Sequence, residues 1–115
     1  AIGQNDSHPV DFMKENPRGD MAEKWRRHYQ DFVLKLRSVY PMAAIILTTT
    51  VLNHAKEWDD AIEEVCFSLG DKKVHHFLYR DNGCKTPGHI RIPEAEQMAE
   101  ELSAYIESLG DEIWR

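Results

Sequence analysis

Side chains that could bind ligands or move protons gather in three short stretches of this chain: Gln4-Asn5-Asp6, Asn53-His54, and 81–89. Two of these stretches contain histidine, whose neutral imidazole is the natural base near pH 7. Asparagine adds an amide that donates hydrogen bonds from a fixed position. These residue types nominate a site for proton transfer and hydrogen bonding, and they leave its chemistry open.

A metal centre is the competing interpretation, because the chain has six histidines. His75 and His76 are adjacent in a predicted strand, so their side chains point to opposite faces and cannot easily share one ion. The sequence has neither a Cys-x-x-Cys nor a His-Glu-x-x-His spacing. We therefore expect no metal and no cofactor.

The composition excludes several classes of protein. The chain has 115 residues, a net charge of −6 and a pI near 5.4, and it has no basic stripe to neutralise nucleic-acid phosphates. Its longest apolar run, 42–47, is too short to cross a membrane. Cys66 and Cys84 are too few for a disulfide scaffold, so a reducing compartment such as the cytoplasm is the default expectation. Nucleic acid and membrane are not expected as partners.

Three helices are predicted from apolar residues spaced three and four apart. The first opens at Asp20 and Glu23, which have capping-box spacing, the second near Trp58, and the third near Pro93, a residue suited to a first helical turn. The residues expected to end them are Pro41, Gly70 and Gly110. The inner face of the third is expected to comprise Ala95, Met98, Ala99, Leu102, Ile106 and Leu109.

Two strands are predicted, at 43–51 and 74–79, with loops before and after them. The first is a continuous β-prone run without alternation, which is typical of a strand covered on both faces in a parallel sheet. Residues 1–3 are interpreted as the last step of an earlier strand, and 4–19 as a loop.

Strands that alternate with helices favour an α/β fold with a parallel sheet and right-handed crossovers. Ligands of such sheets bind outside the carboxyl ends of the strands. The three polar stretches each follow a predicted strand, so we expect them to converge on one rim of the sheet.

These polar residues resemble two blocks of the SGNH (GDSL-type) hydrolase family. Gly3-Gln4-Asn5-Asp6 looks like the family's Gly-x-Asn-Asp block, and Pro87-Gly88-His89 before a helix with Met98-Ala99-Glu100-Glu101-Leu102 looks like its histidine block. The stretch 48–54 and the helix that opens at Trp58 are similar to bacterial members close to the carbohydrate esterases.

The resemblance implies a role for each matching residue. Asn5 would help form an oxyanion hole, with Gly3 and Asp6 as supporting residues of its turn, and His89 would be the general base. Negative charge builds on the carbonyl oxygen during acyl transfer, and a fixed amide donor stabilises it. Asn53 and His54 would line a substrate pocket or cap the next helix.

Two parts of the family pattern are missing from the sequence. The nucleophile belongs to a Gly-Asp-Ser block, and none of the five serines, Ser7, Ser38, Ser68, Ser103 and Ser108, lies in such a block. Thr86 stands where the family has the Asp that orients its histidine. A backbone carbonyl or Asp81 would then take that role.

We therefore expect residues 1–115 to be one partial domain, the C-terminal portion of a three-layer α/β/α, flavodoxin-like SGNH fold that lacks its N-terminal strands. Ala1-Ile2 would end the third strand of that fold. An unpaired sheet edge invites association, so we expect pairing with the missing N-terminal segment or with another copy.

The expected function is ester hydrolysis by Ser-His chemistry on a carbohydrate or another small acyl ester, without a cofactor. This chain alone would be inactive, because it lacks the nucleophile. The alternative is a non-catalytic α/β domain that binds or assembles through its open sheet edge.

Overall fold

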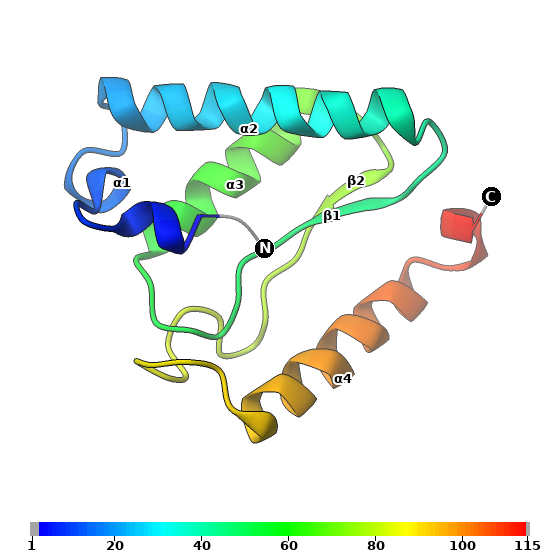
Figure 1. Ribbon diagram of the computed structural model, residues 1–115. Helices are drawn as coiled ribbons and strands as arrows, with labels where there is room; N and C mark the ends of the chain where they lie inside the picture. Colours follow the sequence, from blue (N-terminus) through cyan, green and yellow to red (C-terminus); the bar gives the residue numbers. More distant parts are fainter. Residues whose placement is uncertain (1–2, 115) are drawn as a thin grey trace.

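The computed structural model describes residues 3–114 as a mixed α/β chain with a two-stranded parallel sheet (Figure 1). The elements, in order, are η1 (Asn5–Ser7), α1 (Phe12–Glu15), α2 (Asp20–Val39), β1 (Ile45–Leu47), α3 (Lys56–Leu69), β2 (Val74–His76), α4 (Ile92–Ser108) and η2 (Asp111–Trp114). None of the helices in these described residues is long and apolar enough to span a membrane.

Helix α2 lies where the apolar spacing predicts it, but the capping-box prediction is wrong. The N-cap is Gly19, and no side chain caps the helix. Glu23 instead accepts hydrogen bonds from Arg18 and Arg26, each at 3.3 Å. Because these two guanidinium groups hold its carboxylate, Glu23 does not reach back to the helix start.

Both strands are shorter than predicted. β1 and β2 pair in parallel over three residues each, with Ile45 opposite Val74. Beyond Leu47 the chain continues to pair with the loop that follows β2, because the amides of Gly83 and Lys85 donate to the carbonyls at positions 50 and 51. The second half of the predicted first strand is therefore a loop that is held by hydrogen bonds to the loop after β2.

The core lies between the sheet and the helices α2 and α3. Helix α3 begins two residues before Trp58 and ends at Gly70, whose φ of +58° is the left-handed conformation that glycine adopts easily. The buried cluster comprises Tyr29, Val33, Leu47, Ile62, Val65 and Val74. A second cluster places Trp58 with Met13, Ala22 and Ala61, and so fixes α1 and the N-terminal segment against α3.

Helix α4 packs more loosely than its predicted inner face implies. Met98, Leu102, Ile106 and Leu109 are only partly buried, while Ala95 and Ala99 are exposed. Its main described ring contact is Tyr105 stacked on Phe77, with ring centroids 4.6 Å apart. Figure 1 shows α4 (orange) on the other side of the strands from α2.

The predicted strand at residues 1–3 falls largely outside the described residues, which begin at Gly3. Gly3 itself is a buried bend against the rings of Trp25 and Trp58. The predicted loop 4–19 contains the short helices η1 and α1.

Candidate functional site

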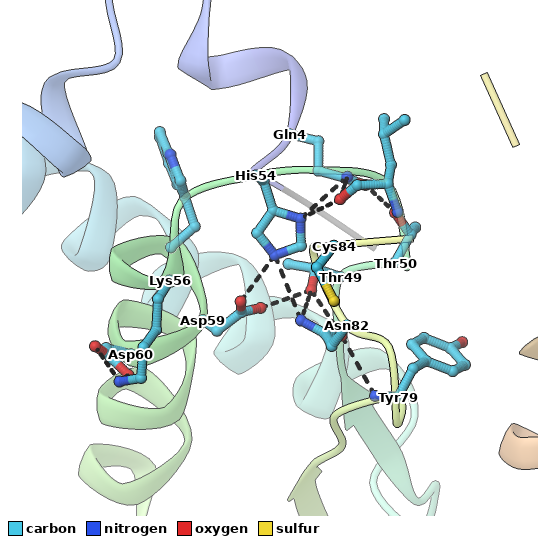
Figure 2. Close-up of polar contacts among 12 residues, drawn as sticks. Gln4, Thr49, Thr50, His54, Lys56, Asp59, Asp60, Tyr79, Asn82 and Cys84 are labelled. Carbon is cyan, nitrogen blue, oxygen red and sulfur yellow. Dashed lines mark hydrogen bonds and ion pairs between the residues drawn. The ribbon is translucent and has the colours of Figure 1, made fainter. Parts of the chain in front are cut away.

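The three polar stretches meet at the carboxyl ends of β1 and β2, as the alternation of elements predicts. Side chains from the first and third stretches lie close to His54 of the second: the Gln4 amide nitrogen is 3.4 Å from Nδ1, and the Asn82 amide nitrogen is 3.4 Å from Nε2 (Figure 2). The rim therefore joins residues far apart in sequence.

His54 is buried between two oxygen acceptors. Its Nδ1 lies 2.7 Å from the carbonyl oxygen of Leu52, and its Nε2 lies 2.8 Å from Oδ2 of Asp59. A neutral imidazole has only one N–H, so both short contacts are satisfied together when both nitrogens carry a proton. With the side chain only 3% exposed, His54 forms a buried ion pair and does not face solvent.

The pKa values of the pair agree with this geometry. Burial acts to lower the pKa of His54, but the hydrogen bond and charge of Asp59 outweigh it and raise that pKa above the usual value. Burial likewise acts to raise the pKa of Asp59, and hydrogen bonds from His54 and Thr49 outweigh it and lower that pKa. Both shifts favour the charged pair.

Thr49 and Asn82 complete the hydrogen bonding around Asp59. The Thr49 hydroxyl donates to Oδ1 of Asp59 at 2.6 Å and accepts from the Asn82 amide at 3.2 Å. Oδ1 of Asn82 accepts from the backbone N–H of Tyr79 at 3.3 Å. The carboxylate thus has partners on both oxygens, as a buried charge requires.

Gln4 connects the N-terminal segment to this network. Its amide nitrogen donates to the carbonyl oxygen of Leu52 at 3.3 Å, and its carbonyl oxygen accepts from the Thr50 hydroxyl at 2.7 Å. The residue that follows, Asn5, is thereby held next to the rim.

Gly83 allows the loop after β2 to lie directly on His54. Its φ is +72°, and a Cβ at this position would lie 3.1 Å from the imidazole ring. The backbone N–H of His54 also donates to the Gly83 carbonyl at 3.0 Å. Both the backbone conformation and the close approach therefore favour glycine.

The residues predicted to act directly in the chemistry are exposed. Asn5 lies at the start of η1, and His89 lies in the loop before α4. Among the described contacts, none joins these two side chains. Asp6 accepts a hydrogen bond from the Trp25 indole at 3.1 Å and so ties η1 to α2.

The residues predicted to orient His89 make other contacts. Asp81 accepts from Gln97 at 3.0 Å and lies 3.7 Å from the Lys85 ammonium. Thr86 is buried, and its carbonyl accepts from the Asn53 N–H at 2.8 Å. Asp81 therefore braces α4, and Thr86 fixes the base of the loop.

Asn53 and His54, the predicted pocket residues, differ in environment. Asn53 is exposed, whereas the His54 ring is buried in the ion pair. A hollow of about 450 Å³ lies between α3 and the loop after β2, and its described lining includes His54, Lys56 and Arg80 but not Asn53. His54 and Asp59 belong to the floor of this hollow.

Sequence reasoning missed Asp59, Thr49, Asn82 and the role of Gln4. The only signal for Asp59 was an acid in the first turn of a predicted helix, five residues after a histidine. In the described part of the chain, no three His, Cys, Asp or Glu side chains are grouped so that they could hold a metal ion.

Comparisons add no relative from which a function could be transferred. No protein-family model matches the chain, and neither a curated protein nor a solved structure matches it.

Proposed function

We propose that this chain contributes an oxyanion donor, Asn5, and a general base, His89, to an SGNH-type hydrolase of carbohydrate or other small acyl esters. The observation that carries the proposal is the joining of three separate segments at one rim through Gln4, His54 and Gly83. The two blocks that resemble the family contain Asn5 and His89 and belong to the first and third of these segments. The proposal therefore requires Asn5 and His89 to approach one another.

The proposed reaction needs a serine from outside residues 1–115. His89 takes the proton of that serine as its oxygen attacks the ester carbonyl, and Asn5 donates a hydrogen bond to the resulting oxyanion. The intermediate collapses as His89 protonates the departing alcohol. Water, deprotonated by His89, then attacks the acyl-serine and releases the acid and the free serine. No cofactor takes part.

We also propose that the sheet belongs to a larger three-layer, flavodoxin-like arrangement. Leu47 and Val74 point into the cluster formed with α2 and α3. Because side chains alternate across a strand, Ile46 and Phe77 point to the other face, where Phe77 meets Tyr105 of α4. Further strands would pair at the open edge of β1.

The group that orients His89 is expected to be other than Asp81, since Asp81 is engaged by Gln97 and Lys85. A backbone carbonyl, or an acid other than Asp81, takes that role in the proposal.

The test uses the natural polypeptide that carries residues 1–115, assayed with p-nitrophenyl acetate and acetylated xylo-oligosaccharides. His89→Ala should lower kcat by about 10²- to 10⁴-fold, and Asn5→Ala by about 10²- to 10³-fold. The control, His28→Ala, changes an exposed histidine of α2 and should leave kcat unchanged. A fluorophosphonate adduct is expected on a serine outside these residues, and full activity in His89→Ala would refute the proposal.

A second candidate function, assembly through the sheet edge, is favoured by an apolar groove beside β1. The groove has a volume of about 480 Å³ and is lined by Met42, Ala43, Ala44, Ile46, Ile106, Ile113 and Trp114. In a parallel pair, alternate backbone groups point away from the partner strand. The occupant that fits is an extended apolar strand.

This second function is tested by sedimentation of the 115-residue chain over a range of concentrations. Concentration-dependent association that Ile46→Lys abolishes, together with no ester turnover by the natural polypeptide, would favour assembly. A monodisperse monomer at all concentrations counts against strand pairing between copies.

A further inference from the structure

We infer that the His54–Asp59 ion pair is a positioning unit that sets the Asn5 turn and the His89 loop in a fixed relation to each other. The inference rests on the proposed function and deepens it. The His54 side chain is 3% exposed and both its ring nitrogens face fixed acceptors within the protein, so we assign it the role of holding other segments.

The first link of this unit leads toward Asn5. The Leu52 carbonyl faces both Nδ1 of His54, at 2.7 Å, and the Gln4 amide, at 3.3 Å. Thr50 fixes the other end of the Gln4 side chain. Because Asn5 is the next residue, displacement of the loop that carries Leu52 displaces the proposed oxyanion donor.

The second link leads toward His89. The imidazole of His54 packs on Gly83, and the backbone N–H of His54 donates to the Gly83 carbonyl. Asn53, the preceding residue, donates to the carbonyl of Thr86 at 2.8 Å. Thr86 is three residues before His89, so the same short segment, 53–54, holds the base of that loop.

The third link anchors both loops to the core. Asp59 lies in the first turns of α3, next to the fully buried Trp58, and is itself one of the buried residues of that helix. The ion pair therefore connects two rim loops to the best-packed helix. A histidine with both nitrogens protonated suits this position, because it donates in two directions from one rigid ring.

The decisive comparison is between adjacent carboxylates of α3. Asp59→Asn removes the charge that pairs with His54, whereas Asp60→Asn removes an exposed charge that pairs with Lys56 at 2.7 Å. Hydrogen exchange of the natural polypeptide is then followed in three regions: 3–8, 80–89 and the core of α3.

Asp59→Asn should speed exchange in 3–8 and 80–89 by at least about tenfold while amides in the middle of α3 keep their wild-type rates. Asp60→Asn should change none of the three regions. Equal acceleration in all three, or none in either rim segment, overturns the inference.

The kcat of the Asp59→Asn variant is a measurement that a purely structural role of the ion pair would leave unchanged. Misplacement of catalytic groups lowers kcat, so Asp59→Asn should lower kcat by about 10- to 100-fold with KM changed less than about threefold. A kcat like that of wild type overturns the positioning role. If no variant or wild type turns over esters, the proposed function fails, and the exchange data still decide whether the ion pair couples the two segments.

Should Asp59→Asn fail to fold, Thr49→Val provides the milder test. It keeps the ion pair and the side-chain shape but removes the hydroxyl that donates to Asp59 and accepts from Asn82. Exchange should rise in 80–89 and stay unchanged in α3. Wild-type exchange in 80–89 overturns the inference.

Discussion

At the scale of single residues, the candidate site is organised by a buried charge. His54 contacts two acceptors from opposite directions, and Asp59 is satisfied by His54 and Thr49. Each of these groups would be costly to bury alone, because an unpaired charge loses its hydration without compensation. The network is therefore sensitive to protonation and to small changes in shape.

The first prediction concerns the pH dependence of stability. A histidine whose pKa is raised on folding stabilises the native state fully below its unfolded pKa, and the effect is lost as the pH rises through the folded pKa. The free energy of unfolding lost in His54→Gln should therefore be larger at about pH 5.5 than at about pH 8.5.

Chemical denaturation of the wild type and the variant at both pH values measures this difference. Subtraction is needed because burial lowers the pKa of His76, which opposes the effect in both proteins. A loss that is equal at the two pH values, or larger at the higher one, contradicts the prediction.

The second prediction concerns Gly83, where the left-handed backbone conformation and the close contact with the His54 ring can be measured separately. Gly70 has a similar φ of +58° with open space around it, whereas a Cβ on Gly83 meets the His54 ring. Gly70→Ala should cost about 1–2 kcal/mol for the left-handed conformation. Gly83→Ala should cost about 1–3 kcal/mol more, from the additional overpacking.

Urea denaturation of the two variants gives both values under the same conditions. Equal losses would mean that the ring moves away without resistance, and that the contact between Gly83 and His54 is not tightly packed.

At the scale of elements, α4 is more loosely attached than α2 and α3. Its inner side chains are only partly buried, and Glu94 is its one buried residue. The stack of Tyr105 on Phe77 is its main described ring contact with the strands. Such an element is expected to open locally without unfolding of the core.

Tyr105→Ala should accelerate hydrogen exchange throughout α4 while α3 keeps its wild-type protection, because a stacked aromatic pair contributes about 0.5–1.5 kcal/mol. Ser103→Ala, an exposed position of the same helix, serves as the control and should change neither helix. Parallel changes in α3 and α4 would show that the two helices unfold as one unit.

The elements also show how far sequence patterns reach. Helices α2, α3 and α4 are predictable because their apolar residues recur at helical spacing and a Pro or Gly lies within two residues of the end of each helix. The strands are overpredicted, since Thr48 to Thr50 are β-prone yet use their hydroxyls for contacts with Phe77, Asp59 and Gln4. Propensity does not register such tertiary hydrogen bonds.

The sequence predicts which segments meet at the candidate site, but not how His54 is placed within it. The alternation of strands and helices predicts that Gln4, His54 and 81–89 converge, and they do. It does not predict that His54 turns inward to Asp59, because that requires the geometry of the loop between them. Buried polar pairs depend on partners that have no fixed spacing in sequence.

At the scale of the whole molecule, stability rests on one side of the sheet. Two strands of three residues are too few to be stable alone, so the cluster formed with α2 and α3 must supply most of the free energy. Ile62→Ala, in that cluster, should lower the free energy of unfolding by about 2–5 kcal/mol.

Ile106→Ala provides the comparison on the opposite face, where the side chain is only partly buried. We expect a loss below about 1.5 kcal/mol, since less apolar surface leaves water there. Thermal or chemical denaturation measures both variants, and similar losses would show that the two faces contribute equally.

The contacts of the His54 network have a consequence for the order of folding. The described hydrogen bonds that join Gln4, the loop after β1 and the loop after β2 all lie between residues 4 and 86. Residues 4–86 precede α4 in the chain, so during synthesis from the N-terminus they leave the ribosome before any part of that helix. The rim can therefore assemble on the nascent chain, with α4 added last to a surface that is already in place.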